Sequence, residues 1–210
     1  MQVDLLKYEK ELYHKGYEYI AGTDEAGRGP LCGPVVASAV ILPKNYHLEG
    51  LTDSKKLSEK KREEYFQIIM KDAISVGVSI IDNHKIDEIN ILEASRLAMN
   101  EAIKKLSVKP DFIITDAMDL KVDNCLPIIK GDAKSITIAA ASVIAKVTRD
   151  HIMYELDEKY PMYELKKHKG YPTKKHIELL EKYGVVDIYR KSYKPVKNIL
   201  ERMQNENIKK

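Results

Sequence analysis

Four carboxylates in this 210-residue chain follow short apolar segments of the kind that form buried strands; they are Asp24, Glu25, Asp116 and Asp132. Acids at strand ends lie along the rim of a sheet, where ligands bind in α/β folds. Because carboxylates at one rim repel one another unless cations lie between them, the set indicates a metal site. Oxygen ligands without His or Cys favour Mg²⁺ or Mn²⁺, and two such ions would support phosphodiester hydrolysis.

Each acid also has a second interpretation, as a helix cap or a turn residue, and spacing alone does not show that the four converge. Successive side chains of a strand point to opposite faces, so Asp24 and Glu25 cannot both point inward from a regular strand. The glycine turn at residues 27–29 is where the backbone could deviate. Asp150 is an alternative fourth ligand, and its other interpretation is an ion pair with Lys146, four positions earlier in a helix.

A polar stripe follows one face of the helix predicted over residues 135–159. Ser142, Lys146 and Arg149 recur in it at helical spacing. The stripe could contact phosphate groups, or it could be the solvent-exposed face of the helix. The sequence is compatible with both interpretations.

Hydrophobic patterning predicts strands and helices in an order that suits an α/β fold. The expected strands cover residues 19–23, 35–42, 74–81, 112–115 and 126–129. The expected helices cover residues 4–15, 58–71, 91–106, 135–159 and 173–183. The first two strands lie close enough in sequence to form an antiparallel pair. The order as a whole favours a mixed sheet with helices packed on it.

The net charge of +3 hides an uneven distribution along the chain. Residues 159–210 hold 14 basic and 6 acidic side chains, a net of +8, which leaves −5 for residues 1–158. The same segment carries six of the 13 tyrosines. Basic side chains interleaved with aromatics suit a nucleic acid, although tyrosines packed beneath lysine stems would give the same composition. We expect one domain over residues 1–158 and a basic helical appendage over residues 159–210.

Several classes of protein are excluded by composition and patterning. The longest uncharged apolar stretch spans 11 residues, 135–145, about half of what a bilayer requires. The charged N-terminal segment has no apolar core of a secretory signal. Cys32 and Cys125 form no CxxC motif. We therefore expect a cytoplasmic protein with reduced thiols and no membrane attachment.

Seven sequence blocks follow one another in a specific order; they cover residues 24–30, 53–57, 90–92, 130–135, 139–150, 168–173 and 192–196. The first reads DEAGRGP, the second DSKKL and the fourth KGDAKS. In these blocks, which extend over roughly residues 17–197, the chain resembles the ribonuclease HII family (type 2 ribonuclease H) in its bacterial form. The family has a ribonuclease H-like fold, so the resemblance implies an α/β architecture with a mixed five-stranded sheet flanked by helices and a C-terminal helical appendage.

The resemblance also implies a reaction. The family's four metal-coordinating acids fall on Asp24, Glu25, Asp116 and Asp132, which favours Asp132 over Asp150. The implied activity is endonucleolytic hydrolysis of the RNA strand of RNA–DNA hybrids, with two Mn²⁺ or Mg²⁺ ions as cofactor. Duplex DNA with single embedded ribonucleotides is a further implied substrate, incised on the 5′ side to leave a 3′-hydroxyl and a 5′-phosphate.

Further residues are matched to substrate binding. Gly27, Arg28 and Gly29 match the family's junction-sensing motif, and glycine lets the backbone approach the ribose 2′-hydroxyl. Tyr171 matches its ribose-stacking tyrosine. Charge and position add the expected phosphate contacts, which are Lys55, Ser142 and Lys146.

One departure from the family pattern lies near the C-terminus. Many relatives carry His-Arg where this chain has Tyr189 and Arg190, which affects the expected contacts of the C-terminal region with DNA and not the metal site. Residues 201–210 lie outside the matched blocks and are predicted to be frayed. We expect a monomer.

Two alternative functions were weighed against the nuclease. A non-catalytic nucleic-acid-binding module would use the basic C-terminal region but has no need for four placed acids. A metal-dependent phosphohydrolase for small nucleotides would use the acids but has no need for the basic region.

Overall fold

The computed structural model describes residues 4–52 and 54–208, with the side chains of Lys55 and of residues 206–208 outside the description. Its centre is a five-stranded sheet in the order β3-β2-β1-β4-β5. The strands are β1 (Ile20–Ala26), β2 (Val35–Ile41), β3 (Ser75–Ile81), β4 (Phe112–Asp116) and β5 (Cys125–Ile128). The first three form antiparallel pairs, whereas β4 and β5 run parallel to β1. The predicted mixed five-stranded sheet is confirmed.

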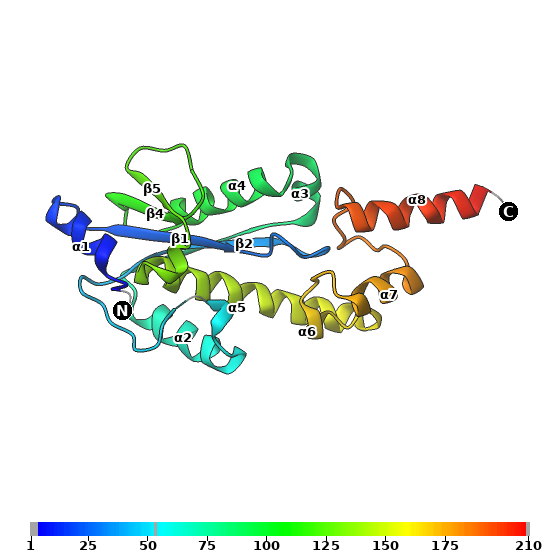
Figure 1. Cartoon of the computed structure of the whole chain (residues 1–210), viewed down its shortest axis with the longest axis horizontal. Helices are drawn as coiled ribbons and strands as arrows, with labels where there is room; N and C mark the ends of the chain where they lie inside the picture. Colours follow the sequence, from blue (N-terminus) through cyan, green and yellow to red (C-terminus); the bar gives the residue numbers. More distant parts are fainter. Residues whose placement is uncertain (1–3, 53, 209–210) are drawn as a thin grey trace.

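Helices cover both faces of this sheet (Figure 1). The α-helices are α1 (Lys7–His14), α2 (Glu59–Asp72), α3 (Asn83–Ile89), α4 (Ile91–Lys104), α5 (Ile136–Lys159), α6 (Leu165–His168), α7 (Lys174–Tyr183) and α8 (Lys194–Ile208). The 3₁₀ turns are η1 (Ser54–Lys56), η2 (Gly131–Ala133) and η3 (Pro161–Tyr163). Helix α5 packs on β1 and β2 with α2 outside it, and α4 packs on β2 and β3.

The first half of α5 approaches the sheet closely because both elements carry small residues there. Residues 139–142, Ala-Ala-Ala-Ser, are all buried. A Cβ at Gly22 of β1 would lie 2.5 Å from the backbone carbon of Thr137, so only glycine fits at that position. Ser135 caps the helix by accepting a hydrogen bond from the Ile138 N–H. This close packing sets the position of α5 over β1, beside the predicted acids.

The segment after residue 159 packs around the end of α5 and the turn that follows β1. Its buried apolar side chains form one cluster with residues from earlier in the chain; the members are Leu31, Cys32, Met153, Tyr163, Leu165, Leu179, Leu180, Tyr189, Val196 and Ile199. A single bridge pairs Cys32 with Tyr189. Figure 1 shows α7 and α8 at the opposite end of the molecule from α1.

The structure differs from the sequence-based prediction in several elements, among them the short helix α6. Strand β1 continues to Ala26, so Asp24 and Glu25 lie inside it rather than beyond its end. Helix α3 was not predicted; it is a seven-residue helix capped by the Asp82 side chain. Helix α8 was not predicted either; residues 201–208, expected to be frayed, belong to it, and residues 209–210 lie outside the described residues. Packing of Ile199 in the cluster above stabilises that helix.

No helix in the described part of the chain is long and apolar enough to cross a membrane, as the sequence predicts.

Candidate active site

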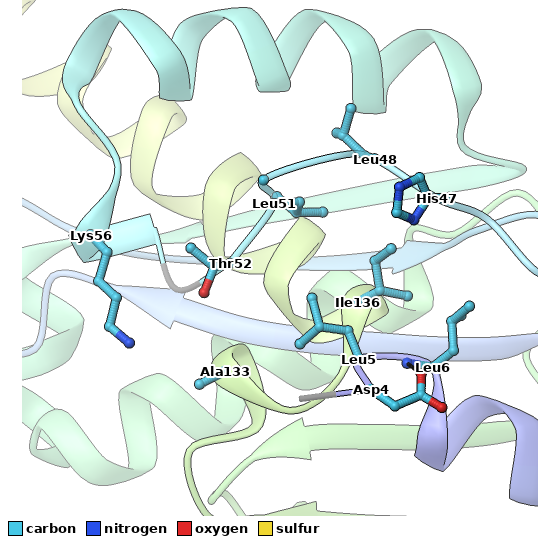
Figure 2. A pocket seen from close by; sticks show the side chains of 11 residues that line it. Asp4, Leu5, Leu6, His47, Leu48, Leu51, Thr52, Lys56, Ala133 and Ile136 are labelled. Carbon is cyan, nitrogen blue, oxygen red and sulfur yellow. Dashed lines mark hydrogen bonds between the residues drawn. The ribbon is translucent and has the colours of Figure 1, made fainter. Parts of the chain in front are cut away.

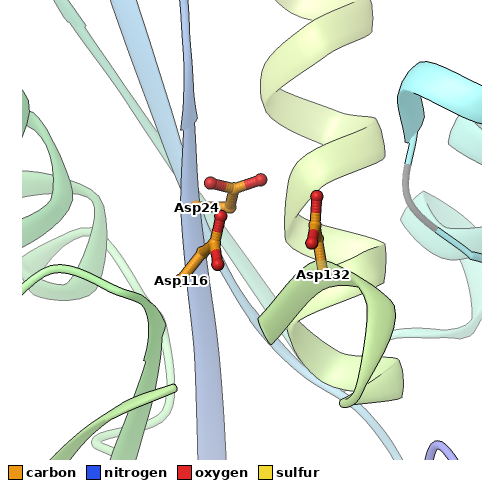
Figure 3. Close-up of side chains that lie close together, drawn as sticks. All are labelled: Asp24, Asp116 and Asp132. Atoms are coloured by element: carbon orange, nitrogen blue, oxygen red, sulfur yellow. The ribbon is translucent and has the colours of Figure 1, made fainter. Parts of the chain in front are cut away.

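Three of the four predicted acids lie together at one edge of the sheet. Asp24 belongs to β1 and Asp116 ends β4, and the parallel register that pairs Thr23 with Thr115 places the two acids side by side. Asp132 comes from η2, just before α5. One ligand atom from each of the three aspartates lies within 4.8 Å of the others, and Figure 3 shows the carboxylates pointing toward one another. Asp24 and Asp132 are each only 5 % exposed.

A hydrogen bond from the Gly131 backbone links the segments that carry Asp116 and Asp132. The Gly131 N–H donates a hydrogen bond of 2.7 Å to Asp116 Oδ1, which ties η2 to the end of β4. A Cβ at Gly131 would lie 2.7 Å from Ile138 Cδ1 of α5 and 3.2 Å from the Thr115 carbonyl oxygen of β4, so a larger residue would require these neighbours to shift. The Lys-Gly-Asp sequence thus positions Asp132 next to Asp116 through the residue that precedes it.

Glu25 lies beside this cluster and is not a member of it. Its Oε1 accepts a 3.4 Å hydrogen bond from Arg28 Nη1, and its Oε2 is buried without a hydrogen-bond partner in the described part of the chain. Burial raises the pKa of Glu25 to about 7; the Arg28 charge opposes the shift, and Asp116 adds to it. A buried carboxylate oxygen without a donor is suited to a cation.

Burial and neighbouring charges act together on Asp24. Burial raises its pKa well above the usual value, the negative charges of Glu25 and Asp116 raise it further, and a hydrogen bond from Ser142 opposes them. Carboxylates held together in this way favour a bound cation, because a cation removes both the repulsion and the cost of burial. With oxygen as the only donor type, the set fits a hard divalent ion such as Mg²⁺ or Mn²⁺.

Asp150 forms the ion pair with Lys146 that was its other interpretation from the sequence. Its Oδ1 accepts a 2.5 Å hydrogen bond from Lys146 Nζ, and Arg62 Nη2 lies 3.8 Å from its Oδ2. The carboxylate is buried and paired, and it is not part of the three-aspartate cluster. Asp150 therefore holds α5 and α2 together through charge.

A cavity of about 390 Å³ brings most of the predicted site residues together; it is lined by Asp24, Glu25, Ala26, Gly27, Arg28, Gly29, Ser54, Asp116, Ser142, Lys146 and Tyr171. Ser54 was missed by sequence reasoning, and its hydroxyl lies 2.8 Å from that of Ser142. Its position in the DSKKL block was the signal that could have found it. The Lys55 side chain is outside the described residues, so its predicted phosphate contact has no structural description.

Arg149 is in neither of the two environments predicted for the polar stripe, contact with phosphate groups or exposure to solvent. It is 1 % exposed, and its guanidinium donates to the backbone carbonyls of Pro34 and Lys169, at 3.0 Å each. The prediction that it contacts phosphate or solvent is therefore wrong. The reason is that the C-terminal region covers this part of α5, which no pattern within the helix indicates. Ser142 and Lys146, by contrast, line the cavity.

The turn after β1 is built against Arg149 and Tyr171. Gly27 has φ +104°, and a Cβ on it would lie 2.2 Å from Arg149 Nε. A Cβ on Gly29 would lie 3.3 Å from Cε1 of the Tyr171 ring. The two glycines therefore let the turn lie between a buried arginine and the predicted ribose-stacking tyrosine.

Tyr171 is itself held by a buried histidine. His176 Nδ1 lies 2.9 Å from the Tyr171 carbonyl oxygen, and its Nε2 lies 2.9 Å from the hydroxyl of Tyr189. The His168 ring stacks on the His176 ring at 4.1 Å. Tyr189, where this chain departs from its relatives, thus takes part in supporting Tyr171 instead of facing solvent.

Stability is expected to fall in mild acid because of His176. Burial lowers the pKa of His176 to about 4, against 6.5 for an unperturbed histidine. Below pH 6.5 the unfolded chain takes up a proton that the folded chain does not. The contribution of neutral His176 to the free energy of unfolding is therefore fully present above pH 6.5 and is lost as the pH falls toward 4. At pH 5 the loss is about 2 kcal/mol. Urea unfolding at pH 7.5 and pH 5 should show a smaller difference in His176→Asn than in the unmodified protein. An equal difference in both would contradict the assignment.

A second cavity, of about 510 Å³, lies on the other side of η2, between residues 4–6, the loop at residues 47–56 and the start of α5 (Figure 2). Its walls are formed largely by Leu5, Leu48, Leu51 and Ile136, and none of the four predicted acids lines it. This cavity, although larger than the one beside Asp24, is therefore not the candidate active site.

Comparison with known proteins agrees with this site. A family model described as ribonuclease HII matches residues 21–196. The chain belongs to the ribonuclease HII family. Ribonuclease HII of Acholeplasma laidlawii is 55 % identical over 200 residues, which are 95 % of this chain and 99 % of that protein. Ribonuclease HII of Bacillus subtilis is 56 % identical over 197 residues, which are 93 % of this chain and 77 % of that protein.

Solved structures agree with the ribonuclease HII fold. Ribonuclease H2 from Pyrococcus horikoshii superposes with a TM-score of 0.79 at 30 % identity, covering 89 % of this chain and 99 % of that one. A ribonuclease HIII bound to Mn²⁺ superposes with a TM-score of 0.65 at 16 % identity over 89 % of this chain and 70 % of that one, a likeness of fold alone.

Family membership decides between the functions considered from the sequence. As a ribonuclease HII family member, the chain is a metal-dependent endonuclease that hydrolyses phosphodiester bonds in the RNA strand of RNA–DNA hybrids. It is therefore neither a non-catalytic binding module nor a phosphohydrolase of small nucleotides.

Proposed function

We propose that Asp24, Glu25, Asp116 and Asp132 form the hydrolytic site, and that the enzyme also incises duplex DNA on the 5′ side of a single embedded ribonucleotide. The products would be a 3′-hydroxyl and a 5′-phosphate. The observation that carries this proposal is the three-aspartate cluster, whose ligand atoms lie within 4.8 Å of one another beside a cavity lined by the glycine turn and Tyr171.

The cofactor we propose is a pair of Mn²⁺ or Mg²⁺ ions. Asp24 would be one of the ligands, since it lies in the three-aspartate cluster. Asp116, Asp132 and the unpartnered oxygen of Glu25 complete the ligand set. When bound, the ions neutralise the acids, activate a water for in-line attack and stabilise charge on the leaving oxygen.

The remaining cavity residues bind and orient the substrate. The Gly27–Gly29 turn approaches the ribose at the cleavage position, and the partly exposed ring of Tyr171 offers it a flat surface. Ser142 and Lys146 contribute a hydroxyl and an ammonium to the same cavity, the latter fixed at the wall by Asp150. Lys55 is assigned to phosphate from its place in the sequence.

The C-terminal region is proposed to bind the duplex on either side of the cut. Its net charge of +8 is opposite in sign to that of residues 1–158. The half-buried Lys169 lies two positions before Tyr171 of the cavity, and the exposed Lys166 and Lys167 precede it in the same segment. Phosphate contacts of this kind supply affinity without sequence preference. A monomeric state and a cytoplasmic location stay predictions.

The proposal is tested with a duplex that contains one ribonucleotide in one DNA strand. We expect incision on its 5′ side in Mg²⁺ or Mn²⁺, none in EDTA and none in an all-DNA duplex of the same sequence. Product ends are identified by phosphatase and ligase treatment. A continuous RNA–DNA hybrid serves as the positive control for a folded, metal-loaded enzyme. Cleavage of the hybrid without incision beside the single ribonucleotide in either metal would overturn the proposed second substrate.

Removal of the Tyr171 ring should reduce selectivity more than affinity. Stacking on an aromatic ring contributes about 1–3 kcal/mol, so Tyr171→Ala is expected to lower incision at a single ribonucleotide roughly tenfold or more. Tyr171→Phe keeps the ring and should keep most of the activity. Tyr183→Ala, which removes a similarly exposed tyrosine outside the cavity, is the matched control. Equal kinetics for Tyr171→Ala and Tyr183→Ala would contradict the role given to Tyr171.

A further inference from the structure

Two arginines lie fully inside the protein beneath the turn that follows β1. Arg190 is 0 % exposed and Arg149 is 1 % exposed. Neither forms an ion pair with a carboxylate in the part of the chain that the structure describes. Both instead donate to the carbonyl oxygen of Pro34, Arg149 through Nε at 3.0 Å and Arg190 through Nη2 at 3.1 Å. Buried charges of this kind are retained only where their hydrogen bonds are well satisfied.

Arg190 directs most of its remaining donors at the turn itself. Its Nη2 donates to the Gly27 carbonyl at 2.7 Å, and its Nη1 donates to the Arg28 carbonyl at 3.1 Å. Its Nε donates to the Gly33 carbonyl at 3.0 Å, which closes the far end of the same segment. Hydrogen bonds from a charged donor are stronger than neutral ones, so this fork fixes the orientation of two successive peptide groups.

Tyr193 completes the arrangement. Its hydroxyl donates to the Arg28 carbonyl at 2.6 Å and accepts a 3.0 Å hydrogen bond from Arg190 Nη1. The guanidinium carbon of Arg190 also lies 5.2 Å from the centre of the Tyr193 ring. The Arg28 carbonyl therefore has two donors, and both belong to the C-terminal region.

The hydrogen bonds to the carbonyls of Gly27 and Arg28 also determine where the N–H groups of Arg28 and Gly29 point. The described chain has no cis peptide bond, so each N–H points away from the carbonyl of the residue before it. Because the carbonyls of Gly27 and Arg28 point toward Arg190, the N–H groups of Arg28 and Gly29 point to the other side. Neither N–H has a hydrogen-bond partner among the residues that the structure describes, and both residues line the cavity that contains Asp24.

We propose that Arg190 and Tyr193 are positioning residues for substrate selection, which hold the Arg28 and Gly29 N–H groups toward the sugar at the cleavage site. The inference rests on the proposed role of the Gly27–Gly29 turn in reading that sugar. Two fixed donors can meet the oxygen of a 2′-hydroxyl, which is the group that distinguishes a ribonucleotide from a deoxyribonucleotide. Neither Arg190 nor Tyr193 needs to touch the nucleic acid for this effect.

The decisive variant is Tyr193→Phe, which keeps the ring beside Arg190 and removes only the hydroxyl. We measure kcat and KM on a duplex with one embedded ribonucleotide and on a continuous RNA–DNA hybrid. The ratio of the two kcat/KM values is expected to fall about fivefold to tenfold, the effect of one lost hydrogen bond. Arg190→Lys, which keeps the charge but not the fork, is expected to lower the ratio further. If Arg190→Lys does not fold, Tyr193→Phe decides alone.

Tyr163→Phe is the matched control. Its hydroxyl likewise donates to a backbone carbonyl, that of Gly184 at 2.8 Å, and neither residue lines the cavity. If loss of a hydroxyl has only a structural effect, kcat/KM falls in parallel for both substrates and their ratio stays unchanged. This is the result expected for Tyr163→Phe. An unchanged ratio in Tyr193→Phe would overturn the inference. Failure of the unmodified protein to incise at a single ribonucleotide would instead overturn the proposed function, so the two failures are distinguishable.

Discussion

Asp24→Asn is expected to lower kcat by at least about a thousandfold, equivalent to about 4 kcal/mol of barrier, and yet to make the metal-free protein more stable. Activity falls because the variant loses a carboxylate of the proposed metal site. Stability rises because Asp24 is buried and repelled by Glu25 and Asp116 when no cation is bound. Removal of such a functional charge commonly contributes about 1–2 kcal/mol, or several degrees in Tm for a chain of this size.

The two effects are separated by measuring cleavage, hybrid binding and thermal unfolding with EDTA and with Mn²⁺. Mn²⁺ should raise the Tm of the unmodified protein more than that of Asp24→Asn, while hybrid binding is retained in both. Asp150→Asn is the matched control, since Asp150 is equally buried but paired with Lys146. It should lose about 1–3 kcal/mol of stability, a change of opposite sign. Full activity in Asp24→Asn, or a loss of stability like that of Asp150→Asn, would remove Asp24 from the metal site.

Gly27→Ala is expected to lower both the incision activity and the stability of the protein. The added Cβ would lie 2.2 Å from Arg149 Nε and 2.8 Å from the Pro34 carbonyl oxygen, at a residue with φ +104°. Relief of this clash moves the turn or Arg149, and a misplacement of about 1 Å near reacting groups can cost roughly a hundredfold in rate. We therefore expect a loss of that order in kcat/KM on a single embedded ribonucleotide, with a loss of about 3 kcal/mol or more in stability.

Gly16→Ala separates backbone strain from the clash. Gly16 has φ +92°, and nothing lies within 4 Å of a Cβ built on it, so its replacement by Ala carries the conformational cost alone. That cost is about 1–2 kcal/mol, and incision should be unaffected. Denaturant unfolding and single-turnover incision of the two variants provide the comparison. Equal losses of stability in both would show that contact with Arg149 contributes nothing to the effect.

The sequence was sufficient for the sheet, because apolar β-branched segments are local patterns and indicated the five strands. The preference for Asp132 over Asp150 came from the resemblance of the Lys-Gly-Asp block to the family, and the structure places Asp132, not Asp150, with Asp24 and Asp116. The convergence of Asp24, Asp116 and Asp132 could not be derived from spacing alone, since it depends on the parallel pairing of β1 with β4 and on the contact of Gly131 with Asp116. The separation of Glu25 from the three-aspartate cluster likewise needed the structure.

The sequence-based prediction differed most from the structure for charged residues that are buried. Helical spacing placed Arg149 in a polar stripe, and nothing in that stripe indicates that residues 168–193 cover it. Composition described the C-terminal region as a basic surface, whereas Arg190 is fully buried and bonded to the turn after β1. The contacts of Arg190 with this turn join residues more than 150 positions apart, and a local pattern carries no information about them.

The pairing of the first and last parts of the chain has a consequence for protein synthesis. Cys32 pairs with Tyr189, and the N–H of Gly33 donates to the Ile188 carbonyl at 2.9 Å. On the ribosome the residues of the three-aspartate cluster emerge well before these partners. A chain shortened before residue 188 would therefore keep Asp24, Asp116 and Asp132 and lack the contacts that hold the turn after β1.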